Sequence, residues 1–156
     1  MKRLICIELL QTHAKASFYV VRFKDDSASE FEKFIDKFSG KSKFQNNIEE
    51  LVYWMDTIGK NGALDRYFRY EGGKVKAIPV ERSQLRLYCY HLSEQLLIWA
   101  GGGQKITKTF EEDPLLNFQV NLIRRIGDQL RGGIKMGIAK SQGQLLTGNL
   151  EFEIEI

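Results

Sequence analysis

Alternating polar and apolar positions mark the first part of the chain as a β-hairpin. Residues 4–9 alternate between two faces of an extended backbone, and residues 17–23 repeat the alternation after a short polar loop. A period of two is typical of strands, and two such runs joined by a short loop predict a hairpin. Glu8 interrupts the apolar run and no small-residue cleavage site follows it, so we interpret this segment as a strand and not as a signal peptide.

Two amphipathic helices are predicted after the hairpin. Ser27 and Glu30 form a capping box, and a phenylalanine-rich stripe with helical spacing follows until Gly40. Asn47 and Glu50 repeat the capping device before a second apolar stripe. Two such helices need a common apolar surface to cover, and the strands that follow them can supply it.

Short alternating runs separated by tight turns predict a set of antiparallel strands, because short connections can join only antiparallel neighbours. A third helix begins at Asp113 and Pro114, an N-cap residue followed by a proline in the first helical position. The chain closes on an alternating strand over 149–156 that carries glutamates on its outer face. The strands between the second and third helices are predicted at residues 67–70, 74–80, 85–92, 95–100 and 105–110.

These patterns predict an α+β fold. An antiparallel β-sheet meander carries the two helices of the N-terminal half on one face, and an N-terminal hairpin and a C-terminal helix and strand are added to it. With 156 residues, 43% of them hydrophobic, the chain suits a single domain over residues 1–156. We divide it into the hairpin (1–25), the core of helices and meander (27–110) and the C-terminal helix and strand (113–156).

Several classes of function find no support in the composition. Cys6 and Cys89 both lie in apolar strand patterns, where a free cysteine behaves as a small hydrophobic residue, and a disulfide between them is disfavoured. The two cysteines and two histidines lack the spacing of a metal site. No apolar run approaches the length of a membrane span. We therefore expect a cytoplasmic protein without a metal, a cofactor or a membrane partner.

Positive charge is concentrated in the middle of the chain. Nine basic and four acidic residues lie between Lys60 and Phe110, a surplus of +5 in a chain whose net charge is +3. A basic region woven through strands is typical of a surface that holds phosphates, most often those of a nucleic acid. The alternative is a solvated sheet face on which lysines provide solubility and protect an edge.

The strand at residues 85–92 carries the most distinctive chemistry. Its odd-numbered positions are mainly apolar and suit packing under the two helices, so we interpret His91 as a core or rim histidine. Its other face carries Arg86, Tyr88 and Tyr90. Arginine binds phosphate through a bidentate fork and tyrosine rings can stack on bases. The alternative is a structural ladder in which these aromatic side chains only stabilise the sheet.

A run of three glycines, Gly101 to Gly103, precedes two lysines. It lacks the Lys-Ser/Thr of a phosphate-binding P-loop, and no helix follows it directly. We therefore expect it to bend or bulge the backbone between two strands. Such a bulge could bring Lys105 and Lys108 towards the same groove.

The segments LRLY (residues 85–88), LLIW (96–99) and QKITKT (104–109) resemble the core of RelE/HigB-type toxins, most closely the phage-derived HigB-like group. The two preceding helices and the RYFR segment at residues 66–69 follow the order of that family. The resemblance covers about residues 27–110. It implies a RelE-like fold and the toxin component of a type II toxin–antitoxin system, a metal-independent endoribonuclease that cuts mRNA, on or off the ribosome. A helix-turn-helix DNA-binding antitoxin would be its cognate partner.

The resemblance also implies roles for individual residues. Catalysis is assigned to four cations that would stabilise the phosphorane: Arg86, Lys105, Lys108 and Arg69. Contacts with RNA are assigned to Tyr88, Tyr90, Lys74 and Arg82. The general base stays open between Glu81 and a lysine with a lowered pKa.

The chain departs from the compact toxins in three ways. Gln104 stands where the first lysine of a pair would be, and both the N-terminal hairpin and the segment after Phe110 are additional. The additions could cap the sheet, form a homodimer interface or place the acidic strand at 149–156 over the basic groove. The alternative function is a non-catalytic RelE-like scaffold or interaction protein, from a mobile element or binding a regulator. Convergence of Arg69, Arg86 and the two lysines in one concavity would favour the nuclease.

Overall fold

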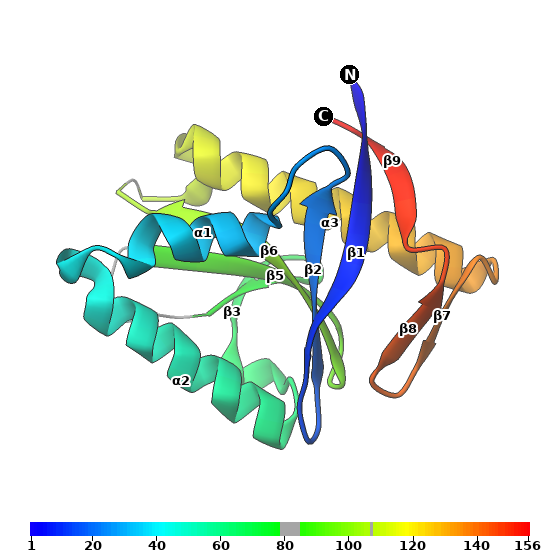
Figure 1. Cartoon of the computed structure of the whole chain (residues 1–156), viewed down its shortest axis with the longest axis horizontal. Coiled ribbons are helices and arrows are strands. Elements are labelled where there is room, and N and C mark those ends of the chain that lie inside the picture. The colour runs from blue at the N-terminus through cyan, green and yellow to red at the C-terminus, as the bar shows by residue number, and fades with distance from the viewer. Residues whose placement is uncertain (79–84, 107) are drawn as a thin grey trace.

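The protein is an α+β protein in which a mixed seven-stranded sheet carries helices on both faces (Figure 1). The computed structural model describes residues 1–78, 85–106 and 108–156. In chain order its elements are β1 (Lys2–Thr12), β2 (Ser17–Phe23), α1 (Glu30–Ser39), α2 (Gln45–Asn61), β3 (Arg69–Gly72), β4 (Val75–Ala77), β5 (Leu85–Ser93), β6 (Leu96–Gln104), α3 (Pro114–Lys135), β7 (Ala139–Gln142), β8 (Leu145–Gly148) and β9 (Glu151–Glu155), with short 3-10 helices at Ser42–Phe44, Asp65–Tyr67 and Phe110–Glu112. The sheet order is β3-β4-β5-β6-β2-β1-β9, and β7 and β8 form a separate hairpin.

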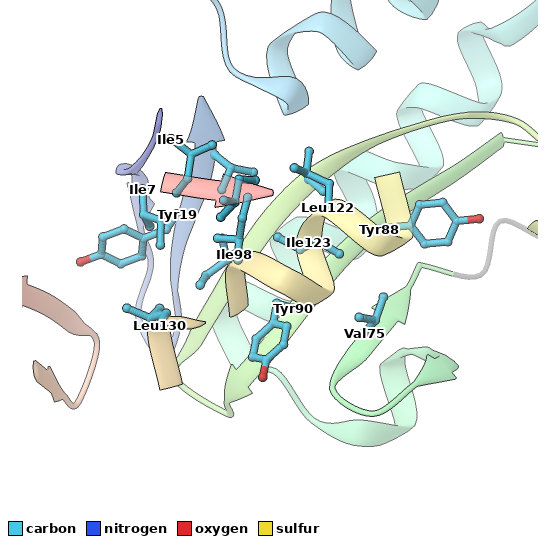
Figure 2. Packing of buried hydrophobic residues seen from close by; sticks show 14 of the residues in the cluster. Ile5, Ile7, Tyr19, Val75, Tyr88, Tyr90, Ile98, Leu122, Ile123 and Leu130 are labelled. Atoms are coloured by element: carbon cyan, nitrogen blue, oxygen red, sulfur yellow. The ribbon is translucent and has the colours of Figure 1, made fainter. Parts of the chain in front are cut away.

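Two hydrophobic cores lie on opposite faces of the sheet. The first packs α1 and α2 against odd-numbered residues of β5 and β6, with Trp99 at its centre in edge contact with Phe18. The second packs α3 against the other face, where Ile98, Tyr88 and Tyr90 contact the helix (Figure 2). Burial of one large side chain stabilises the fold by about 2 kcal/mol, so each face holds its helices firmly.

The N-terminal hairpin is an integral part of the sheet. The strands β3, β4, β5 and β6 form the expected antiparallel meander, but β2 pairs with β6 in parallel, with Ser17 opposite Leu96. The expectation of a purely antiparallel sheet is therefore wrong. Two helices and three strands separate β2 from β6 in the sequence, and turn lengths give information only on strands that follow one another.

The first helix begins two residues later than its capping signals suggest. The N-cap is Ser29, whose hydroxyl accepts a hydrogen bond of 3.1 Å from the Glu32 N–H, and not Ser27. The sequence offers both serines with a glutamate three residues on. Glu30 is instead buried, where Gln119 of α3 and Lys33 donate hydrogen bonds to its carboxylate.

The other helix predictions have mixed outcomes. The second helix begins at Gln45, after a 3-10 turn and two residues before the expected cap at Asn47. The third begins as expected, because Asp113 accepts hydrogen bonds from Leu115 N and Leu116 N and Pro114 opens the helix. Clear capping chemistry thus locates a helix start only where a single candidate is present.

The segment after the glycine run is not the strand predicted at residues 105–110. The strand β6 continues through the glycines to Gln104, and a 3-10 helix forms at Phe110–Glu112. The acidic strand β9 is confirmed, but it pairs with β1 at the sheet edge opposite β3, and Glu151 accepts a 2.9 Å hydrogen bond from Lys24. It therefore does not cover the basic region, which lies around the other edge.

Cys6 and Cys89 are free and buried, as expected. Throughout the described ranges, no helix combines the length and apolar character that crossing a membrane requires.

Candidate functional site

Three cations act on one carboxylate near the β3 edge of the sheet. Arg69 and Glu71 are two residues apart on β3, and Arg69 Nε lies 3.4 Å from Glu71 Oε1. Arg86 of β5 and Lys105, which follows β6, both act electrostatically on Glu71. The charges that act on Glu71 thus come from three separate parts of the chain. We call Arg69, Glu71, Arg86 and Lys105 the basic cluster.

The basic cluster shifts the protonation of its own members. The Glu71 side chain is only 11% exposed, and burial raises its pKa more than Arg69, Lys105 and Arg86 lower it. Burial, followed by the repulsion of Arg69 and Arg86, lowers the pKa of Lys105. Burial and Arg69 also lower the pKa of Arg86. The cluster thus holds a carboxylate that is a stronger base than usual beside an ammonium group that is a stronger acid.

Glycines position Arg86 within the sheet. A Cβ at Gly102 would collide with the carbonyl oxygen of Arg86, so only glycine permits this approach of β6 to β5. The register between the two strands shifts between Leu87 and Cys89. The irregularity therefore lies within β6, and not between two strands as expected. The Arg86 side chain is half-buried, and its Nη1 donates a hydrogen bond of 2.9 Å to Leu85 O.

Tyr88 and Tyr90 do not form a stacking surface. They do share a face with Arg86, but their exposures are 1% and 0% because α3 covers them. The Tyr88 ring lies 6.4 Å from that of Phe110, and the Tyr90 hydroxyl donates a 2.8 Å hydrogen bond to Asp128 of α3. The expectation that these tyrosines contact RNA bases is wrong in this fold, because the third helix was treated as an addition when it is half of the core.

The remaining assigned residues lie apart from the basic cluster. Lys108 is exposed, and within the described residues no contact joins it to Glu71. Lys74 is half-buried and donates a weak hydrogen bond to His91 O, on the α2 side of the sheet. Arg82, together with the candidate base Glu81, lies outside the described residues. Of the four cations assigned to catalysis, the structure thus brings together three.

Glu71 is the residue that sequence reasoning missed. It lies between the strands predicted at residues 67–70 and 74–80, whereas β3 extends to Gly72 with a shift of register between Tyr70 and Gly72. His91 lies in the core rim as expected, and its ring contacts Phe68. Over the described parts of the chain, no group of three or more metal-ligating side chains comes together.

Comparison with known proteins gives no match to this chain among family models, curated proteins or solved structures.

Proposed function

We propose that this protein is a metal-independent endoribonuclease, the toxin component of a type II toxin–antitoxin system. The observation that supports this most directly is the nearly buried Glu71 carboxylate among Arg69, Arg86 and Lys105. The resemblance of residues 27–110 to RelE/HigB-type toxins supports a RelE-like fold for that part of the chain. Its substrate would be mRNA, free or on the ribosome.

The basic cluster contains the groups that cleavage by a 2′-hydroxyl needs. Glu71 would take the proton of the 2′-hydroxyl, whose oxygen then attacks the adjacent phosphorus. Lys105, whose lowered pKa makes it a better acid, would donate a proton to the departing 5′-oxygen. The products are a 2′,3′-cyclic phosphate and a 5′-hydroxyl. Arg86 and Arg69 would stabilise the charge on the phosphorane, where loss of one such group typically costs about 10²–10³ in rate.

The resemblance extends the proposal to partners. A helix-turn-helix antitoxin would hold the toxin inactive in the cytoplasm, and the face at the β3 edge is the surface that it would have to block. A homodimer through the added segments is compatible with this arrangement, since β9 and the β7–β8 hairpin lie away from β3.

Cleavage of a labelled single-stranded RNA in the presence of a chelator tests the proposed activity. We expect the wild type to cut and to leave cyclic phosphate ends, and Arg86→Gln to cut at least 100-fold more slowly. Lys140→Gln, on the distant hairpin strand β7, is the matched control for loss of one positive charge. Induced expression in cells should arrest growth and fragment mRNA with the wild type only. Healthy cells and intact RNA with both forms would reject the nuclease.

A non-catalytic scaffold is the second candidate, and one observation favours it. The α3 helix covers most of the face that carries Arg86, Tyr88 and Tyr90, which leaves only the end of that face accessible. A protein partner at the basic cluster could use this smaller surface. Intact folding of the wild type without cleavage of any RNA would favour the scaffold.

A further inference from the structure

A second candidate site, with two lysines in its wall, lies on the opposite side of the sheet from the basic cluster. A pocket of about 350 Å³ opens beside β4 and the end of β5, and its walls include Lys74, Lys76 and His91. Lys76 and Lys74 project away from the α3 face, since Val75 and Ala77 of the same strand pack in the α3 core. The Lys76 side chain is only 16% exposed, so its charge is held in place at the pocket.

The carboxylate of Asp65 lies at the wall of this pocket. Asp65 Oδ1 lies 3.3 Å from His91 Nδ1 and 3.8 Å from Lys76 Nζ, which is the arrangement in which a phosphate oxygen would be held. The Asp65 side chain is 84% exposed, so an anion of higher charge, such as phosphate, can displace it. Glu94 is the other acidic residue in the pocket wall and is exposed. The pKa of His91 is lowered, because burial, together with the two lysines, outweighs the hydrogen bond with the Ala63 backbone and the charge of Asp65, which raise it.

An exposed aromatic ring adjoins the pocket. Tyr70 of β3 is 66% exposed, and Lys76 Nζ lies 5.1 Å from the centre of its ring. Its hydroxyl accepts a hydrogen bond of 2.9 Å from Gly73 N, which fixes the orientation of the ring. A phosphate group in the pocket would thus lie beside a ring on which a base can stack. A solvated lysine pair alone would offer no such platform.

We infer that Lys74, Lys76 and His91 form a phosphate-binding pocket that takes a nucleotide, with its base on Tyr70. Taking RNA as the source of that phosphate rests on the proposed function, whereas binding of phosphate itself does not. Because β3 is the edge strand, an RNA strand that crosses it would contact the basic cluster on one face and this pocket on the other.

Histidine resonances in NMR spectra test the phosphate pocket directly. The chain has two histidines, and His13 packs against Phe18 and does not line the pocket, so it is an internal control. Inorganic phosphate and uridine monophosphate should shift the His91 ring signals in a saturable manner and leave His13 unchanged. Asp65→Asn should bind both ligands more tightly than the wild type, and Lys76→Gln more weakly. No shift of His91, or equal shifts of both histidines, would overturn the inference.

The two substitutions should change the affinity for phosphate in opposite directions. Destabilisation of the fold would weaken binding in both variants, so this result would identify an effect on binding itself.

The assignment of RNA as the source of the phosphate is tested by fluorescence anisotropy with an uncleavable 2′-O-methyl strand of about ten nucleotides. Tyr70→Ala should weaken its binding about tenfold, and Lys76→Gln should reduce the slope of log affinity against log salt by about 0.7. If these variants bind the RNA strand with the affinity and salt dependence of the wild type, RNA is not the ligand of this pocket. A His91 response to phosphate in a protein that binds no RNA would support the pocket and reject the nuclease.

Discussion

Glu71 combines two properties that oppose each other at the scale of a single residue. Its burial works against ionisation, and three neighbouring cations favour it. Because burial has the larger effect, the folded protein binds the Glu71 proton more tightly than the unfolded chain does. This contribution to stability is present below pH 4.5 and is lost as the pH rises through the higher pKa of the folded state. At neutral pH the ionisation of this buried carboxylate therefore lowers the free energy of unfolding.

Glu71→Gln should consequently separate stability from activity. Glutamine resembles the protonated carboxyl group, so the free energy of unfolding at pH 7 should stay equal to the wild type or increase. RNA cleavage should fall by at least about 100-fold, since the general base is lost. The acid limb of the wild-type rate profile should lie above pH 4.5. Urea unfolding measures the stability and RNA cleavage assays measure the activity, with Glu153→Gln at an exposed position as the control. A destabilised variant that still cleaves would make Glu71 a structural ion-pair partner.

At the scale of elements, local chemistry locates helices better than it sets their ends. The helix at Asp113 and Pro114 begins where its sequence indicates, because one N-cap candidate precedes it. At the first helix, two serines compete, and tertiary structure decides between them. Glu30 is drawn into a buried hydrogen bond with Gln119, which lies 89 residues away in the sequence. A window of a few residues contains no information on such a contact.

Alanine substitution of the two serines should distinguish their roles. Ser29→Ala should reduce the free energy of unfolding by about 1 kcal/mol, because the N–H of Glu32 loses its buried acceptor. Ser27→Ala, at an exposed position outside the helix, should have little effect. Denaturant melts of both variants provide the measurement. Equal losses would mean that the helix begins at Ser27 in solution.

The packing of α3 on β5 can be tested with two glycines of the same helix. A Cβ at Gly127 would collide with the buried Tyr90 ring, whereas none of the neighbouring atoms lies within 4 Å of one at Gly132. Gly127→Ala should therefore destabilise the fold by about 1–3 kcal/mol. Gly132→Ala should stabilise it by about 0.5–1 kcal/mol, as alanine favours the helix. Similar effects of the two substitutions in thermal melts would argue against this packing of α3 on β5.

The tyrosines of β5 show why the site was only partly predictable. Alternation correctly placed Arg86, Tyr88 and Tyr90 on one face, but it cannot tell a solvent-facing surface from one that a distant helix covers. Only Arg86 lies at the end of the face and reaches the basic cluster. Glu71 and Lys105 join it through the pairing of β3, β4 and β5 and the end of β6, which are contacts that local patterns do not specify.

At the scale of the whole molecule, the parallel pairing of β2 with β6 joins the N-terminal hairpin to the meander. The sequence predicts the hairpin as an extension, yet β2 lies between β6 and β1 and pairs with both. The β9 strand then extends the sheet on β1. Such a continuous ladder predicts that the two ends of the sheet unfold together.

The two cysteines report on this cooperativity from opposite parts of the sheet. Cys6 lies in β1 and Cys89 in β5, both are buried, and burial raises the pKa of each thiol, so both should react slowly with a disulfide reagent in the folded protein. With increasing urea, both should become reactive at the same concentration as the loss of circular dichroism, as mass spectrometry of the labelled peptides would measure. Labelling of Cys6 at a lower concentration would mean that β1 and β9 open as a separate unit, less stable than the strands that carry the basic cluster.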